Sequence, residues 1–112
     1  MEKIPFTPQR WQVAAENDRW KVAYLGHCER FGRLTGMERH LETDEVFVLL
    51  RGSAKLCVED TVHEMEQGVV YNVKKGEWHH IVVSEDAAVL VLENSDTSPD
   101  NTEKRSVSNA HK

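Results

Sequence analysis

The sequence predicts a single all-β domain, and three observations lead to this fold class. The chain has 112 residues, enough for one compact domain with a modest core. Segments rich in β-branched and aromatic residues recur at short intervals, separated by turn residues such as Gly, Asn, Asp and Ser. No segment has a helical periodicity strong enough to compete with this pattern. Short strands at regular spacing are typical of a β-sandwich or β-barrel.

The turn signals divide the chain into strand-sized segments. A first hairpin is expected around the turn residues 16–19, and a second around Gly52. Further turns lie at Asp60, Gly68, Gly76 and 84–86. The expected strands are 11–15, 20–25, 46–50, 54–58, 62–65, 69–73, 79–83 and 87–92.

Two of the expected strands are apolar on both faces. Neither 46–50 nor 87–92 alternates with polar residues as a strand with one solvated face would. A chain of this size has little material for a second covering layer. We therefore expect one face to pack against another copy of the chain, in a homodimer.

Composition and charge exclude several classes of protein. Lys and Arg number 14 against 19 Asp and Glu, and this net charge of −5 repels a phosphate backbone, so no nucleic-acid partner is expected. No apolar run approaches the ~20 residues that span a bilayer, and no membrane partner is expected. The first five residues lack the apolar core of a secretory signal, which predicts a cytoplasmic protein. Cys28 and Cys57 are expected to be free thiols.

The composition changes near the C-terminus. From Asn94 onward the chain is rich in Ser, Asp, Asn, Thr and Lys, and Val107 is its only large aliphatic residue. Such a segment buries too little apolar surface to offset the entropy of ordering it. The sequence therefore predicts a barrel over residues 1–100 and a disordered polar tail over 101–112, whose removal from Thr102 onward would leave the fold intact.

Four side chains are candidates for a metal site. Glu38 and His40 are two residues apart, so they share one face of a strand. The short polar segment 41–44 would return Glu45 beside His40 on the next strand, and His79 begins a later strand. His79 and His80 point to opposite faces, so only one of them joins a common site. Two imidazoles and two carboxylates suit Mn, Fe, Co, Ni or Zn.

These residues lie in a pattern that resembles the cupin superfamily. The first cupin motif runs Gly, five residues, His-x-His, three or four residues, Glu, six residues, Gly. Here it is Gly32, five residues, Glu38-Arg39-His40, four residues, Glu45, six residues, Gly52. The motif spans 32–52.

The second cupin motif runs Gly, five residues, Pro-x-Gly, two residues, His, three residues, Asn. Here it covers 68–83, with Gly68, Gly76 and His79 at the motif spacing. Three positions depart from the family: Glu38 stands for the first histidine, Lys74 for the proline and Val83 for the asparagine.

The resemblance implies a jelly-roll barrel, or double-stranded β-helix, of the small single-domain cupin type. It implies that His40, Glu45 and His79 are ligands of a divalent metal ion, and Glu38 joins them as an altered ligand. The family includes dioxygenases, isomerases, epimerases and lyases acting on small polar metabolites. Three hypotheses remain open: a metal-dependent enzyme, a non-catalytic module that binds a carbohydrate or organic acid, and an empty structural barrel. His27 is a further candidate ligand or proton carrier.

Overall fold

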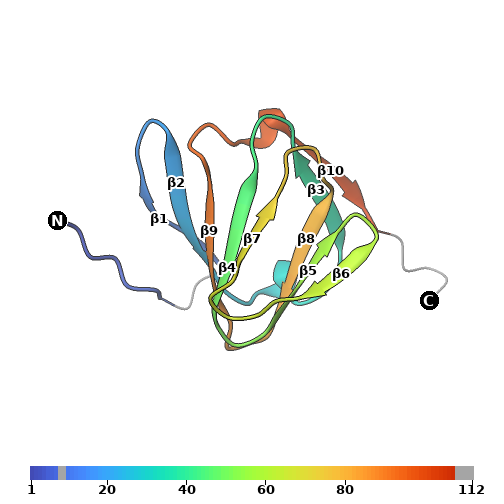
Figure 1. Ribbon diagram of the computed structural model, residues 1–112, viewed down its shortest axis with the longest axis horizontal. Coiled ribbons are helices and arrows are strands. Elements are labelled where there is room, and N and C mark those ends of the chain that lie inside the picture. The colour runs from blue at the N-terminus through green and yellow to red at the C-terminus, as the bar shows by residue number, and fades with distance from the viewer. Residues whose placement is uncertain (8–9, 108–112) are drawn as a thin grey trace.

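The protein is described by a computed structural model that covers residues 1–7 and 10–107. Within these residues, ten strands form two five-stranded sheets that face each other (Figure 1). The order in sheet 1 is β1-β2-β9-β4-β7, and the order in sheet 2 is β10-β3-β8-β5-β6. The strands are β1 (Trp11–Glu16), β2 (Trp20–Leu25), β3 (Gly36–His40), β4 (Glu45–Arg51), β5 (Ala54–Val58), β6 (Thr61–Glu64), β7 (Val70–Val73), β8 (His79–Val83), β9 (Ala88–Asn94) and β10 (Thr102–Ser106). Two short 3-10 turns are η1 (Glu29–Phe31) and η2 (Pro99–Asn101).

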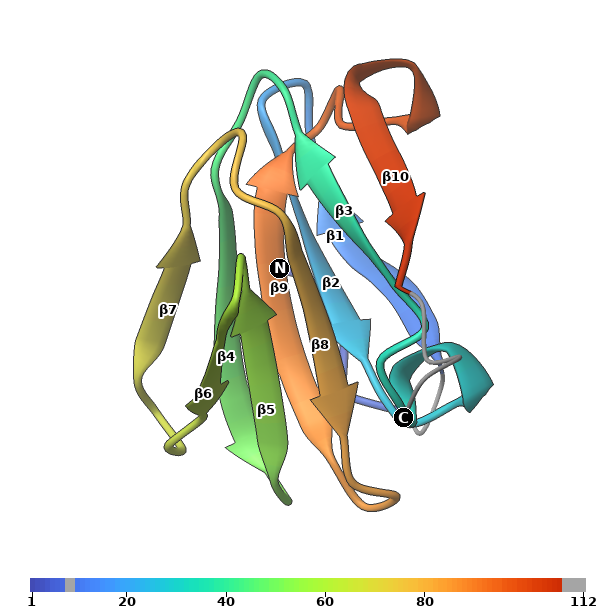
Figure 2. The same ribbon diagram turned by 90° about the vertical axis from the view of Figure 1, so that its right-hand side faces the viewer.

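All strand pairs within the two sheets are antiparallel, and several join segments far apart in the sequence. Strand β9 lies between β2 and β4, and β8 lies between β3 and β5 (Figure 2). The all-β jelly-roll fold predicted from the sequence is confirmed, and each expected strand is present within about two residues of its expected ends. No helix within the described residues has the length and apolar character needed to cross a bilayer.

The inner faces of the two sheets form one apolar core. Alternation along β4 and β9 sends Phe47, Leu49, Val89 and Val91 inward, where they are almost fully buried. Side chains of sheet 2, such as Leu56, pack against them. Leu25, Phe47 and Ile81 of this core also line the cavity described below.

Tight turns connect the strands, and Gly52 shows why one of them needs glycine. Its φ is 77°, and a Cβ added there would lie 2.8 Å from the Cα of Ala87. Both the left-handed backbone and the close approach exclude larger residues at this position. The β4–β5 hairpin therefore depends on Gly52, the last glycine of the first motif.

The prediction of a disordered tail from residue 101 is wrong for Thr102–Ser106. These residues form β10, which pairs with β3 along its length, from Thr102 opposite His40 to Ser106 opposite Gly36. Backbone pairing, not apolar burial, orders this segment, and composition does not report it. Residues 108–112 of the expected tail lie outside the described residues.

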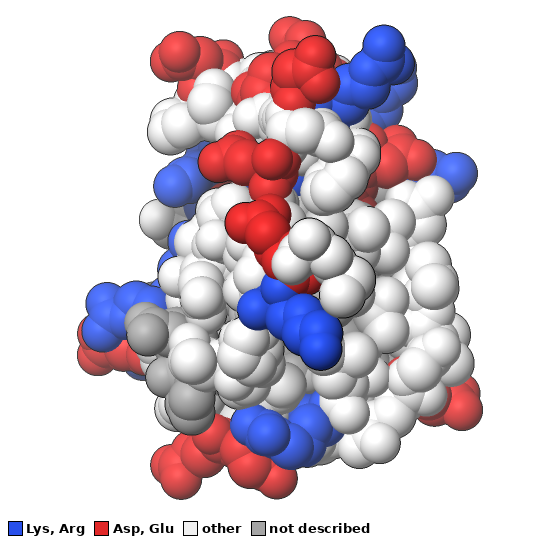
Figure 3. All heavy atoms as spheres, turned by 90° about the vertical axis from the view of Figure 1, so that its left-hand side faces the viewer, with Lys and Arg blue, Asp and Glu red and all other residues white. Residues whose placement is uncertain are grey.

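The outer face of sheet 1 is apolar over β4 and β9. Alternation places Val46, Val48 and Leu50 of β4 outward, beside Leu90 and Leu92 of β9. Figure 3 views the molecule from this side: charged side chains gather near the top and bottom edges and in a strip down the middle, and a broad uncharged area lies to the right of that strip. Among the described residues, the N-terminal segment contacts this face at Tyr24 and Arg51.

That contact is local and well defined. The ring of Phe6 lies edge-on to Tyr24 with centroids 5.3 Å apart, and the Tyr24 hydroxyl donates to the carbonyl of Ile4 at 2.9 Å. The guanidinium of Arg51 lies 5.3 Å from the centre of the Phe6 ring. The outer face of β4 and β9 is left apolar, and the exposed Val70 of β7 extends it.

Candidate metal centre

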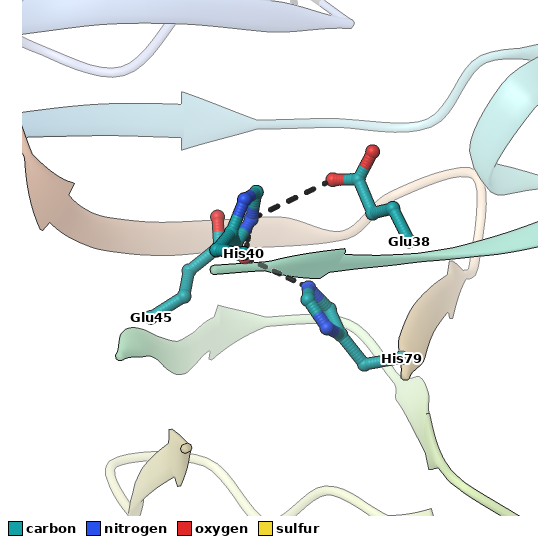
Figure 4. A group of neighbouring side chains, drawn as sticks. All are labelled: Glu38, His40, Glu45 and His79. Atoms are coloured by element: carbon teal, nitrogen blue, oxygen red, sulfur yellow. Dashed lines mark hydrogen bonds and ion pairs between the residues drawn. The ribbon is translucent and has the colours of Figure 1, made fainter. Parts of the chain in front are cut away.

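Glu38, His40, Glu45 and His79 meet at the polar end of the barrel interior (Figure 4). Each offers one ligand atom, and these four atoms lie within 4.8 Å of one another. Glu38 and His40 lie on β3, Glu45 begins β4 and His79 begins β8. His40, Glu45 and His79 are buried, and Glu38 is half-buried. Two sheets therefore bring together side chains that are up to 41 positions apart in the chain.

Glu45 lies at the centre of this group. Its Oε1 is 2.9 Å from Nε2 of His40 and 2.9 Å from Nε2 of His79. The Oε2 of Glu38 lies 3.8 Å from the same Nε2 of His40. One carboxylate oxygen thus faces two imidazole nitrogens, with a second carboxylate beside them.

Partners on the far side of each ring orient the two imidazoles. Nδ1 of His79 donates to the carbonyl of Glu77 at 3.1 Å, since a carbonyl oxygen only accepts. Nδ1 of His40 lies 2.9 Å from the hydroxyl of Thr102 on β10. When His79 is neutral in this tautomer, the lone pair of its Nε2 points toward the Glu45 carboxylate. Two hydrogen-bond acceptors then face each other, and this contact is stable only if a proton or a metal ion lies between them. The group of side chains therefore fits a divalent metal ion.

In the absence of a metal ion, protons take the place of the cation, and the pKa values of the two histidines and Glu45 show this. Burial favours neutral imidazoles, but the hydrogen bond and charge of Glu45 outweigh it and raise the pKa of both His40 and His79. Burial likewise opposes ionisation of Glu45, yet hydrogen bonds from the two histidines hold its pKa well below the usual value. The cluster therefore attracts positive charge strongly.

Glu38, which replaces the first histidine of the cupin motif, has its own cationic partner. Its Oε1 accepts a hydrogen bond from Arg30 at 3.2 Å, and its Oε2 faces His40. Arg30 belongs to η1 and also lies over the Phe31 ring, 4.9 Å from its centre. The extra negative charge brought by glutamate at this position is thus partly compensated.

A cavity of about 400 Å³ opens beside the four side chains. Trp11, Phe31 and Phe47 form apolar parts of its lining, and Lys21, Glu93, Thr97 and Lys104 form polar parts. A cavity of this size accommodates a small metabolite.

Sequence reasoning missed Lys21 and Glu93. The amine Nζ of Lys21 lies 3.4 Å from Oε2 of Glu93, and both side chains are largely buried. Burial and the adjacent Glu45 carboxylate raise the pKa of Glu93 to about 8, against the opposing charge of Lys21. The sequence does contain a sign of this pair, because each residue is charged at a position that alternation points inward. On its strand, Lys21 precedes the inward residues Ala23 and Leu25. On the other strand, Glu93 follows the inward residues Val89 and Val91.

The other histidines considered from the sequence lie apart from the four-residue group. His80 is buried, but its Nε2 lies 3.1 Å from the carbonyl of Arg33, and its ring stacks near Phe31. Burial lowers the pKa of His80, in contrast to its neighbour His79. His27 is exposed and lies beside Gly32, outside the group.

Comparison with known proteins establishes the class of protein. A family model described as "Cupin domain" matches residues 32–93, more than half of the chain. The chain therefore belongs to the cupin family. The matched region runs from the first glycine of motif one to Glu93, so β10 with Thr102 lies beyond it.

Solved cupin-like structures share this fold. A Streptomyces PAC13 variant with uridine is 9% identical, with a TM-score of 0.69, covering 88% of this chain and 77% of its own. KdgF from a Halomonas species is 15% identical, with a TM-score of 0.62 and coverage of 80% and 81%. A cupin-2 domain protein from Shewanella frigidimarina is 26% identical, with a TM-score of 0.59 and coverage of 75% and 78%. A sequence search of curated proteins finds no match.

Proposed function

We propose that the protein is a divalent-metal cupin whose pocket binds or transforms a small polar metabolite. The observation that carries this proposal is the position of two imidazole Nε2 atoms, both 2.9 Å from one oxygen of Glu45. His40, Glu45 and His79 would hold the ion, with Glu38 as a fourth ligand. The set of nitrogen and oxygen donors suits Fe, Mn, Ni, Co or Zn.

The ion would supply Lewis-acid activation of a bound carbonyl or an anchor for dioxygen, the chemistry of dioxygenases, isomerases or lyases. Around it, the residues of this chain have separate tasks. Thr102 and the Glu77 carbonyl keep the two imidazoles turned toward the centre. Phe47, whose ring centroid is 5.9 Å from that of His79, provides an apolar wall that limits water access.

The alternative is a non-catalytic module that binds a carbohydrate or organic acid. The observation in its favour is Glu38, which takes the place of a motif histidine and is engaged by Arg30. In this version the pocket is kept for binding and the altered ligand set performs no reaction. A bound metal combined with reversible ligand binding and no turnover would favour the module.

The metal proposal is tested by elemental analysis of protein purified without an affinity tag. We expect about one divalent ion per chain, lost in His79→Ala and kept in His80→Ala. These adjacent histidines are both buried on β8, so the pair separates loss of a ligand from loss of a buried ring. Wild-type protein that binds no ion after incubation with Mn, Fe, Co, Ni or Zn would contradict the proposal.

We also propose a homodimer formed through the outer face of sheet 1. Val46, Val48, Leu90 and Leu92 are half-buried there and present uncharged apolar surface, which a second copy can cover in spite of the net charge of −5. A two-fold axis lets the same face serve both copies. A cytoplasmic location accords with the two free cysteines, Cys28 and Cys57.

A further inference from the structure

A buried lysine and glutamate lie together in the cavity wall next to the candidate metal ligands. Lys21 and Glu93 face each other across β2 and β9, and their side chains are only 15% and 6% exposed. Burial of an ammonium group costs desolvation that contact with one carboxyl group offsets only in part, so such a pair is a weak source of stability. Its position in the lining of the cavity suggests a role in binding.

The ammonium group of Lys21 has more N–H bonds than it has partners among the described residues. An ammonium group carries three N–H bonds. The Lys21 Nζ lies 3.4 Å from Oε2 of Glu93, and it donates a hydrogen bond to the carbonyl of Thr97 at 3.0 Å. Within residues 1–7 and 10–107, the amine makes these two contacts, which leaves one N–H for a ligand.

Thr97 provides a second, independent observation. Its Oγ1 is buried and has no hydrogen-bond partner among the described residues. Thr97 lines the same cavity, and its carbonyl already holds Lys21. A buried hydroxyl without a partner costs free energy, and such groups call for an explanation, such as a ligand that supplies the missing bond.

The charges around the cavity favour an anion once the metal site is filled. Three carboxyl groups and three cationic side chains line the cavity. A divalent ion would add two positive charges, giving an excess that attracts negative groups. The carboxyl groups belong to Glu38, Glu45 and Glu93, and the cationic side chains are Lys21, Arg30 and Lys104.

From this geometry we propose that Lys21 and Thr97 form an anion-binding subsite, which takes a carboxylate or phosphate group of the ligand. This inference rests on the proposed function for the location of the rest of the ligand at the metal centre. Val46 pairs with Leu92, so Glu45 and Glu93 lie side by side, and Lys21 pairs with Glu93. Lys21 is thus two strands from the candidate metal ligand Glu45, with Glu93 on the strand between them. A ligand within the cavity of about 400 Å³ would reach both.

The experiment titrates small probes that need no knowledge of the natural ligand. Acetate, inorganic phosphate and neutral acetamide are added to the ¹⁵N-labelled full chain, with and without Zn²⁺, and the amide resonances of Thr97 and Ser98 are followed. We expect saturable shifts with acetate or phosphate, none with acetamide, and tighter binding in the presence of Zn²⁺. The stronger of the two anions identifies the preferred group.

Three variants assign the effect to the subsite. Lys21→Met and Thr97→Val should each lower the affinity for the anion about tenfold, which is the effect of losing one charge-assisted hydrogen bond. Lys55→Met is the matched control, because Lys55 is exposed on the outer face of sheet 2, where it pairs with Glu64. Thr97→Val removes only a hydroxyl without a partner, so it keeps the test valid if Lys21→Met fails to fold.

The outcomes separate the two proposals. Absence of saturable shifts with both anions, or wild-type affinity in Thr97→Val together with any folded Lys21→Met, would overturn the subsite. Anion binding at Thr97 in protein that binds no Zn²⁺ would support the subsite and contradict the metal centre. Zn²⁺ binding without anion binding would leave the metal centre standing and remove the subsite.

Discussion

The two sheets differ on both of their faces, and the difference explains how a small barrel divides its tasks. On the inside, sheet 2 supplies Glu38, His40 and His79, while sheet 1 supplies Glu45 and, beyond it, Glu93. Neither sheet holds the candidate metal centre alone. The site therefore exists only when the two sheets are packed at their correct separation.

The outer faces differ just as clearly. Sheet 2 carries solvated charge there: Arg39 pairs with Glu103, and Arg39 and Arg105 lie over the Trp78 ring at 4.6 and 4.3 Å from its centre. Over β4 and β9, sheet 1 presents valine and leucine instead, as the half-buried pair Val48 and Leu90 illustrates. A sheet with one solvated face needs no partner, whereas a sheet that is apolar on both faces does. This contrast is the physical basis of the dimer proposal.

Removal of residues 102–112 should have the largest effect, because it strips the edge strand from sheet 2. The variant loses the β10–β3 ladder and the Thr102 hydroxyl that contacts His40. We expect a loss of roughly 2 kcal/mol or more, corresponding to a fall in melting temperature of about 10 °C. Removal of 108–112 alone is the control, since β10 is kept. Equal melting temperatures for the two truncations would show that β10 adds no stability.

Glu45→Gln breaks the one contribution of sheet 1 to the candidate ligand set. The amide keeps the shape of the side chain but loses the anion that faces both imidazoles. We expect metal affinity, measured by calorimetric titration, to fall at least ~100-fold, because second-shell partners of ligands already account for roughly 10- to 100-fold. Glu42→Gln, in the exposed β3–β4 connection, is the control. Unchanged affinity in Glu45→Gln would remove Glu45 from the site.

A pair of valines sharpens the comparison of the outer faces. Val70 on β7 of sheet 1 and Val62 on β6 of sheet 2 are exposed to 64% and 60%, and both lie on edge strands. Val70→Lys places like charges at the proposed two-fold interface, so we expect the dimer to dissociate at micromolar concentration in light scattering. Val62→Lys should leave the protein dimeric in the same measurement. A monomeric wild-type protein, or equal behaviour of the two variants, would refute the interface.

The pH dependence of stability is the smallest expected effect, and its sign depends on the metal. The pKa values of His40 and His79 are raised, so in metal-free protein their contribution is complete below the ordinary value of 6.5 and is lost as pH rises through the folded-state values. Glu93, with a pKa raised to about 8, acts in the same direction. The lowered pKa of Glu45 acts oppositely, since its contribution is present above the ordinary value of 4.5 and is lost in acid.

Metal-free protein should therefore be most stable at about pH 4.5, weaken above it because of Glu93, and weaken more steeply above about pH 6.5 as the contribution of the two histidines is lost. Metal binding requires neutral imidazoles, so the gain in melting temperature from added Zn²⁺ should instead grow with pH over the same range. Thermal unfolding at several pH values, with and without Zn²⁺, measures both trends. Parallel curves would mean that protons and metal do not compete for the same nitrogen atoms.

Much of the fold was predictable because short runs of β-branched and apolar residues between turn residues are typical of strands. The apolar run 46–50 and the turn at Gly52 located a hairpin that the structure contains. The convergence of His40, Glu45 and His79 was predictable from motif spacing, since equal spacing on the same barrel places side chains alike. The strand β10 was not predictable, because its five residues, Thr102–Ser106, are all polar and their order comes from pairing with β3.

The sequence by itself determined the all-β class, the positions of the turns and the identity of the four candidate ligands, because these depend on local alternation and on spacing along the chain. Only the tertiary structure decided which groups orient and surround them. Thr102, Arg30, Lys21 and Glu93 come from segments that lie close to the ligands only after the two sheets pack. Contacts between such segments depend on register and sheet order, which no local pattern of residues encodes.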